Sequence, residues 1–238
     1  VAAEGAYRRA HDLARDTDTP ALVARAAARH GIAFYADERA QLARAADCRA
    51  ALSDLAATDV ADDGLRARLL ANLAAADPTD PDRVATADDA VSIARRLGDP
   101  ETLGIALVAQ QVADLGPTTM ARRLRTSREI IALAQACGEG DLSVRGRFLL
   151  KNALLEAGDT RELDAELIAQ DRSITEIAEQ RFSRHSLWFR CMRATLDGRA
   201  AEAEMLATEC LTMAQALDDP DGFGVYTGQY GVALWLQG

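Results

Sequence analysis

The chain has 238 residues, of which 49% are hydrophobic and 27% are charged, and its formal net charge is −10. This balance is typical of a folded domain and excludes an intrinsically disordered segment. Because an acidic chain is repelled by phosphate backbones, the composition also argues against direct nucleic-acid binding. Aromatic residues make up 5%, and no alternating run of β-branched residues predicts a strand. The apolar stretches are shorter than the ~20 residues of a membrane span.

Helix-start and helix-stop signals predict about twelve helices. In chain order they cover 1–16, 20–35, 38–57, 63–76, 81–97, 100–114, 118–137, 141–157, 160–180, 184–197, 199–217 and 220–236. Capping side chains before proline mark four of the starts, because proline is favoured in a first helical turn: Thr19, Asp80, Asp99 and Asp219. A capping box from Asp159 to Glu162 marks a fifth start. Four glycines that follow apolar runs are expected to end helices in the left-handed conformation: Gly98, Gly138, Gly158 and Gly198.

A phrase that reads as a helix end, a small polar turn and a new helix recurs six times. Its second position is always alanine, and we use these residues as reference alanines: Ala14, Ala56, Ala94, Ala134, Ala178 and Ala214. The steps between them are 42, 38, 40, 44 and 36 residues. Such a period predicts a helical repeat array. We therefore expect one all-α domain over 1–238, a right-handed solenoid of antiparallel helix pairs in about six repeats.

The end of the chain fits the same period. Gly158 and Gly198 lie 24 and 20 residues after their reference alanines, and Gly238 lies 24 after Ala214. We therefore expect the chain to stop in mid-repeat, as a fragment of a longer multidomain protein. Trp235 and Leu236 would then lie where a following helix covers them.

Motifs for catalysis or metal binding are missing from the sequence. Lys151 is the only lysine and has no P-loop around it. The three histidines share no motif, and the Asp-rich turns are explained as helix caps rather than calcium loops. The four cysteines have no CxxC spacing, which favours buried thiols in a reducing cytoplasm. We therefore predict a cytoplasmic protein that is not an enzyme, with no catalytic residue, cofactor or metal.

One region concentrates cations and aromatic rings. Arg181–Arg193 reads RFSRHSLWFRCMR, and the helix before it carries further basic residues at the equivalent turn. Such a groove could bind an acidic peptide, a partner helix or an anionic ligand, with Trp188 or Phe189 as the anchor. The candidate binding residues on the expected concave face are Arg145, Arg147, Lys151, Asn152, His185, Trp188, Arg190, Arg193, Tyr226 and Tyr230. The alternative, which we favour, is that Phe189 and Met192 belong to the core while the arginines pair with neighbouring acids.

The last predicted helix carries three glycines on one face, at 224, 228 and 231. Each costs about 1 kcal/mol relative to alanine, so something should offset them. We expect close packing against a neighbouring helix. The alternative is a pocket floored by backbone and surrounded by Tyr226, Gln229 and Tyr230.

Three segments resemble known helical repeats. Leu154–Leu167 and Thr195–Leu217 resemble tetratricopeptide hairpins. Ala87–Leu107 resembles the tetratricopeptide-like region of large actinobacterial regulators that carry an AAA/STAND-type ATPase and often a LuxR-type DNA-binding domain. The resemblance covers 80–238 well and 1–80 loosely. Because the family's catalytic and DNA-reading residues lie in other domains, none can be assigned here.

The resemblance implies a protein-interaction or ligand-sensing module of a cytoplasmic transcriptional regulator, with a role in signalling. A protein, a peptide or a small ligand on the concave face would change the curvature of the array and so bias an attached domain. Neither nucleic acid nor a membrane is an expected partner. One alternative is a structural scaffold that self-associates, for instance as a homodimer. A less favoured one is an enzyme on a helical scaffold.

Overall fold

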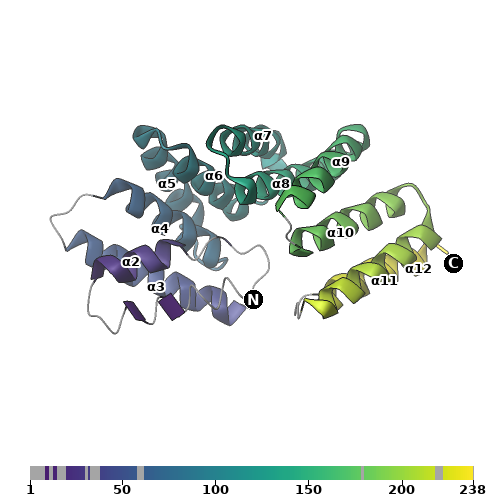
Figure 1. The fold of residues 1–238 in the computed structure, drawn as a ribbon, viewed down its shortest axis with the longest axis horizontal. Helices are drawn as coiled ribbons and strands as arrows, with labels where there is room; N and C mark the ends of the chain where they lie inside the picture. Colours follow the sequence, from purple (N-terminus) through teal and green to yellow (C-terminus); the bar gives the residue numbers. More distant parts are fainter. Residues whose placement is uncertain are drawn as a thin grey trace. The chain divides into compact units, whose positions relative to one another are not determined.

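The computed structural model describes residues 9–10, 13–14, 20–29, 32, 38–57, 62–177, 180–217 and 222–237. All regular structure in these ranges is helical, with no strand among them, which confirms the all-α class (Figure 1). The α-helices are α2 (Pro20–Arg29), α3 (Glu38–Ala56), α4 (Asp63–Ala76), α5 (Arg83–Leu97), α6 (Pro100–Ala113), α7 (Met120–Cys137), α8 (Gly140–Ala157), α9 (Thr160–Ile177), α10 (Gln180–Leu196), α11 (Ala200–Ala216) and α12 (Gly222–Trp235). A short 3-10 helix, η1 (Pro117–Thr119), precedes α7.

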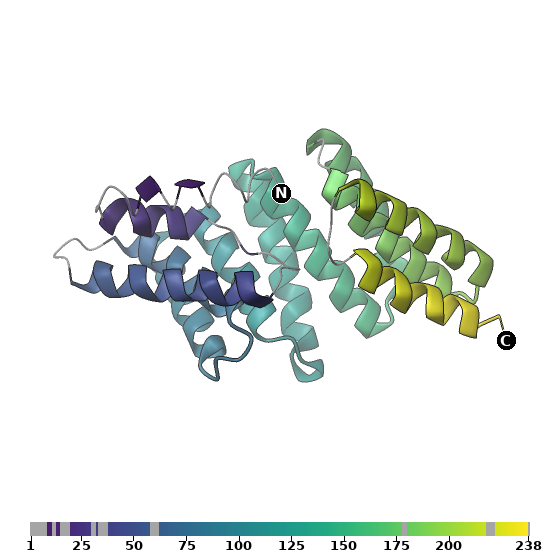
Figure 2. The same cartoon turned by 90° about the horizontal axis from the view of Figure 1, so that it is seen from below.

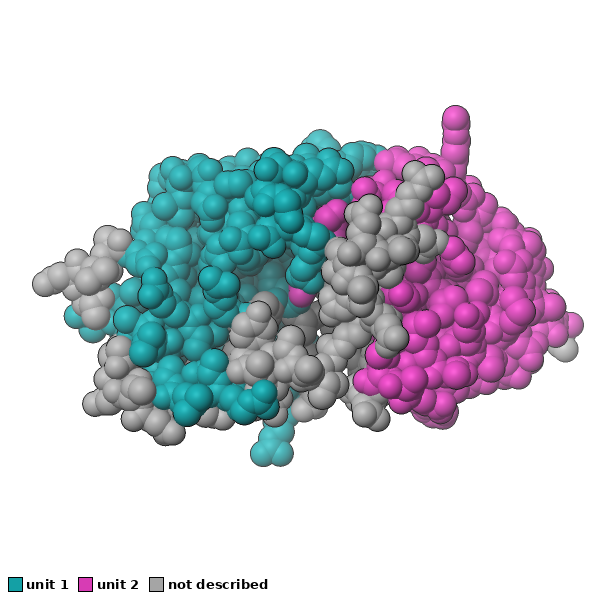
Figure 3. Space-filling view, viewed as in Figure 1, with its two compact units in different colours: residues 1–142 teal, residues 143–238 magenta. Residues whose placement is uncertain are grey.

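The chain divides into two compact units, residues 1–142 and 143–238 (Figure 3). The boundary falls in the first turn of α8, so unit 1 holds α2 to α7 and unit 2 holds most of α8 together with α9 to α12. The expectation of one domain over 1–238 stays a prediction.

Consecutive helices pack together from α2 to α7 in unit 1 and from α9 to α12 in unit 2. In unit 1 this holds for every consecutive pair from α2 to α7, and α4 also contacts α2 and α6. In unit 2, α10 packs against α9, α11 and α12, and α11 lies beside α12 (Figure 2). Short connections and contacts with the next two helices are expected of stacked helical hairpins.

The helix ends follow local chemistry. The four glycines predicted to stop helices all have left-handed backbone, with φ of 70°, 74°, 72° and 72° at Gly98, Gly138, Gly158 and Gly198, so this prediction is confirmed. Two predicted caps are also confirmed. Asp99 Oδ2 accepts a hydrogen bond from the Thr102 backbone N–H (3.0 Å), and Asp159 Oδ1 accepts one from the Glu162 N–H (3.0 Å).

The predicted start of α5 is wrong by two residues. Asp80 was expected to cap a helix from Pro81, but α5 begins at Arg83. Asp80 Oδ1 instead accepts from the Asp82 backbone N–H (2.9 Å), and Arg49 Nη2 donates to Asp80 Oδ2 (3.1 Å). These bonds hold Asp80 in a turn, so the helix starts later. The predicted caps at Thr19 and Asp219, and most of the predicted helix 1–16, lie outside the described residues.

Small residues let the helices approach one another closely. Four reference alanines are buried, Ala14, Ala94, Ala134 and Ala214, with exposed fractions of 7%, 0%, 1% and 1%. Ala56 differs, since it is exposed near the end of α3, and Ala178 lies outside the described residues. In most copies of the recurring phrase, the reference alanine therefore lies on the buried face of its helix.

The expectation of close packing at the three glycines of α12 is wrong. A Cβ built on Gly224, Gly228 or Gly231 would meet no atom within 4 Å. The close approach occurs at Gly222 instead, where a Cβ would lie 2.2 Å from Ala214 Cβ of α11. The alternative of a pocket finds no support either, because these three glycines are exposed on the outer side of the helix.

Candidate functional site

Helices α8 and α10 bring four aromatic rings together in unit 2. Phe148 of α8 lies with its ring centroid 4.9 Å from His185, 6.3 Å from Trp188 and 5.4 Å from Phe189. The three α10 residues are spaced at i, i+3 and i+4, so they share one helix face. That face contacts α8 at Phe148.

Lys151 lies inside this cluster rather than on a surface. Its side chain is fully buried, and Nζ lies 4.1 Å from the centroid of the Phe189 ring. A cation at that distance from a ring face is attracted by the ring quadrupole. The expected role of Lys151 as a surface contact therefore needs correction, because a partner cannot reach it in this arrangement. Phe189 is only 1% exposed and cannot be the predicted anchor either.

His185 is buried and uncharged near neutral pH. Burial, followed by the charges of Arg184, Lys151 and Arg145, lowers its pKa to about 3. Among the described residues, the charges that act on this imidazole are positive. We use the name α8–α10 cluster for Arg145, Phe148, Lys151, Arg184, His185, Trp188 and Phe189.

The depressed pKa of His185 predicts a loss of stability in acid. The unfolded chain binds the histidine proton below pH 6.5 whereas the folded chain does not until about pH 3. The stabilisation is therefore complete above pH 6.5 and is lost as the pH falls toward 3. Between pH 7 and pH 4.5 the free energy of unfolding should fall by about 2–3 kcal/mol because of this histidine.

Urea unfolding at a series of pH values measures this effect. The His185→Gln variant is the comparison, because it keeps a polar side chain that does not titrate. We expect the variant to have a flatter stability profile than the parent between pH 4.5 and 7. Parallel profiles for the two proteins would show that His185 titrates normally.

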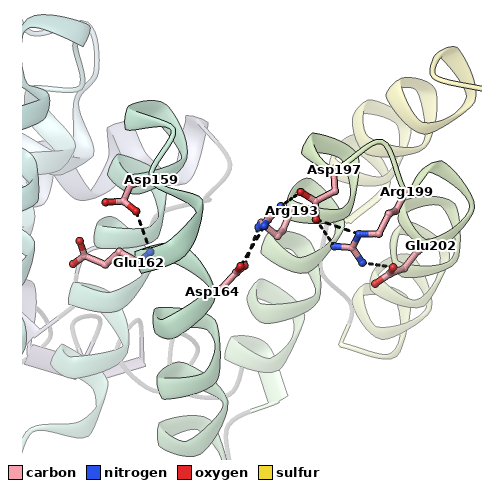
Figure 4. A network of polar contacts seen from close by, with 7 residues as sticks. All are labelled: Asp159, Glu162, Asp164, Arg193, Asp197, Arg199 and Glu202. Carbon is pink, nitrogen blue, oxygen red and sulfur yellow. Dashed lines mark hydrogen bonds and ion pairs between the residues drawn. The ribbon is translucent and has the colours of Figure 1, made fainter.

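Two of the candidate arginines are held in ion pairs with acids of α9. Arg147 Nη1 lies 2.7 Å from Glu166 Oε2. Arg193 Nε donates to Asp164 Oδ1 (2.8 Å), and Arg193 also pairs with Asp197 (Figure 4). Hydrogen bonds with Asp164 and then Asp197 raise the pKa of Arg193. The interpretation that the arginines pair with acids is confirmed at both residues, and Phe189 is confirmed as core.

Three other candidate residues serve local packing. Asn152 Nδ2 donates to the Phe148 carbonyl (3.0 Å) within α8. Tyr226 and Tyr230 stack with ring centroids 4.9 Å apart, against a core that α10, α11 and α12 share. Tyr230 Oη donates to Glu204 Oε1 (3.1 Å). The tyrosines thus form a separate group on the inner side of α12.

The residues left as surface candidates are few. Arg145 and Trp188 are half-buried members of the α8–α10 cluster. Arg190 is exposed but follows Trp188 by two residues, so it points to a different side of α10. Arg184 was not among the residues predicted from the sequence, and it is only 2% exposed. Its position four residues before Trp188, on the same side of the helix, is the sequence signal that could have found it.

The described ranges offer no obvious metal centre, since no three His, Cys, Asp or Glu side chains gather there. Over the same ranges, no helix is both long enough and apolar enough to cross a membrane. No protein-family model matches the chain, and no curated protein matches it.

Proposed function

We propose that this chain is a non-catalytic binding module whose helical hairpins stack as a tetratricopeptide-like, right-handed solenoid. The recurring phrase, the packing of consecutive helices in each unit and the buried reference alanines support the repeat. An array of this kind presents an extended surface to a partner.

The partner that best fits the α8–α10 cluster is an acidic segment of another protein. The observation that carries this proposal is the half-buried pair Arg145 and Trp188, which belong to the same cluster as buried Lys151 and Arg184, in a chain with a net charge of −10. A cation at the surface attracts carboxylates. The half-buried ring of Trp188 adds an apolar contact of the kind that anchors peptides.

The same module fits a cytoplasmic transcriptional regulator. The resemblance of Ala87–Leu107 to actinobacterial regulators of the AAA/STAND, LuxR-type class motivates this part of the proposal. Docking of the acidic segment would stabilise one curvature of the array. The bound array would then bias an attached ATPase or DNA-binding domain.

A random-peptide display library tests the choice of partner. We expect selected peptides to be acidic and to carry an apolar residue for Trp188. Trp188→Ala and Arg145→Glu should each weaken the affinity for a selected peptide about tenfold or more. Arg190→Glu is the matched control, because it makes the same charge change on another side of α10 and should retain the affinity.

The outcome can also contradict the proposal. Selection of peptides without acidic residues would exclude the acidic partner. Equal losses from Arg145→Glu and Arg190→Glu would show that net charge alone controls binding and that the cluster has no special role.

A self-associating scaffold is the second candidate, and one observation favours it. Phe223 and Trp235 of α12 are 67% and 79% exposed, and exposed apolar patches often mark interfaces. Sedimentation at several concentrations separates the two candidates. A monomer throughout would exclude the scaffold, whereas a stable dimer would favour it.

A further inference from the structure

The outer face of α12 is apolar and uncharged. The helix reads GFGVYTGQYGVALW and contains no acid or base. Phe223, Val232 and Trp235 are exposed on it, and nothing lies within 4 Å of a Cβ built on Gly224 or Gly228. This helix face has no partner among the described residues.

Helix α6 is the counterpart of α12 in an earlier repeat. Gly104 lies ten residues after the reference alanine Ala94, and Gly224 lies ten after Ala214. Both follow an Asp-Pro pair in the sequence at the same spacing. The two helices can therefore be compared position by position without a gap.

The same positions are buried in α6 and exposed in α12. In α6 they are occupied by Gly104, Leu107, Val108 and Gln111, all of them buried. In α12 they are occupied by Gly224, Thr227, Gly228 and Gly231, all of them exposed. The outer face of α12 is thus the face that is covered in α6.

The next hairpin in the chain is what covers α6. Leu142, at the start of α8, sits against Gly104 so closely that a Cβ there would lie 2.3 Å from Leu142 Cδ2. Gln111 Nε2 donates to Ser127 Oγ of α7 (3.0 Å). Glycine at position 104 therefore makes room for a leucine side chain from the following hairpin.

We propose that the outer face of α12 docks a helical hairpin of the chain's own repeat type. A leucine at the start of the second helix of that hairpin would sit on Gly224 as Leu142 sits on Gly104. Phe223 would flank it and lose part of its exposure to water, since its counterpart Leu103 is half-buried in α6. The proposal is independent of the ligand of the α8–α10 cluster.

A second copy of the chain fits this face less well. Two α12 helices in a symmetric pair would set glycine against glycine, which leaves the space above Gly224 unfilled. Each copy also carries a net charge of −10, so the two repel each other. A hairpin supplies the large side chains that the glycines leave room for.

A fusion protein tests the proposal. Residues 117–157 are joined after Leu236, which lies 22 residues after Ala214 as Gly116 lies 22 after Ala94. Trp188→Phe, Trp235→Phe and Phe223→Trp are introduced in all proteins, so that position 223 holds the only tryptophan. This position is 67% exposed in α12, whereas its counterpart Leu103 is half-buried in α6. We expect the acrylamide quenching of this tryptophan to fall about twofold or more in the fusion, and the melting temperature to rise by about 4 °C or more.

Gly224→Leu gives the specific control, because it fills the space for the incoming leucine. It should leave the parent chain folded, since a Cβ at Gly224 meets no atom within 4 Å, and it should abolish the protection of the tryptophan at position 223 in the fusion. Unchanged quenching of this tryptophan in the fusion that keeps Gly224 overturns the proposal, whether or not the added hairpin folds. Dimerisation of the parent chain that itself protects this tryptophan also overturns it, because the occupant is then a second copy.

Discussion

Replacing Phe189 by alanine is expected to lower the free energy of unfolding by about 3–5 kcal/mol, the usual cost of removing a buried phenylalanine. The ring is 1% exposed and contacts Phe148 at a centroid distance of 5.4 Å. Its loss would also leave buried Lys151 without the ring that lies 4.1 Å from Nζ. Cavity formation and the lost cation–π contact act in the same direction. Urea unfolding followed by circular dichroism measures the change.

Phe223→Ala is the matched control for this substitution. Phe223 is 67% exposed on α12, so the same truncation should change the free energy of unfolding by about 0.5 kcal/mol or less. Similar losses for the two variants would mean that the α8–α10 cluster is not a packed core. The control also reports whether α12 contributes an unexpected interface.

Gly222→Ala is expected to lower the free energy of unfolding by about 1–3 kcal/mol, the typical cost of overpacking. The added methyl group would lie 2.2 Å from Ala214 Cβ and 3.6 Å from Ala214 Cα. A β-carbon cannot rotate away, so the backbones of α11 and α12 would have to separate. Thermal and urea unfolding both measure this loss.

Gly224→Ala makes the same change two residues later and should act in the opposite direction. A Cβ there meets no atom within 4 Å, and alanine favours a helix by about 1 kcal/mol over glycine. We therefore expect no loss, or a gain of up to about 1 kcal/mol. Equal destabilisation by the two variants would contradict the packing of α12 on α11.

Helix positions could be predicted because their signals are local. Gly98 and Gly158 end helices through their own backbone freedom, and Asp99 caps α6 with its own carboxylate. Each depends on residues that are near neighbours in the sequence. Asp80 instead closes a turn with the Asp82 N–H, and its second carboxylate oxygen is bound by Arg49, 31 residues away.

Contacts between residues that are far apart in the sequence could not be predicted from the pattern. Asn72 of α4 is buried and donates to the carbonyls of Ala27 and Ala28 at the end of α2 (3.2 and 3.0 Å). Nothing in the residues near position 72 signals that role. The repeat steps vary from 36 to 44 residues, so the period does not fix which side of a helix meets its neighbour.

The candidate site was partly predictable for the same reason. The sequence of Arg181–Arg193 shows by itself that this segment is rich in cations and aromatic rings. Which of them pair, which are buried and which face a partner depends on α8 and α9. Arg193 is thus held by Asp164, whereas Trp188 faces Phe148. Of these two residues, only Trp188 is left as a half-buried ring in a cluster that contains cations.

The most direct test of the proposed function is a nuclear magnetic resonance titration of the ¹⁵N-labelled chain with a selected acidic peptide. Our account predicts that the Trp188 indole N–H and the backbone signals near Arg145 and Arg184 shift most. Shifts confined to the outer face of α12 or to unit 1, with Trp188 unchanged, would contradict it.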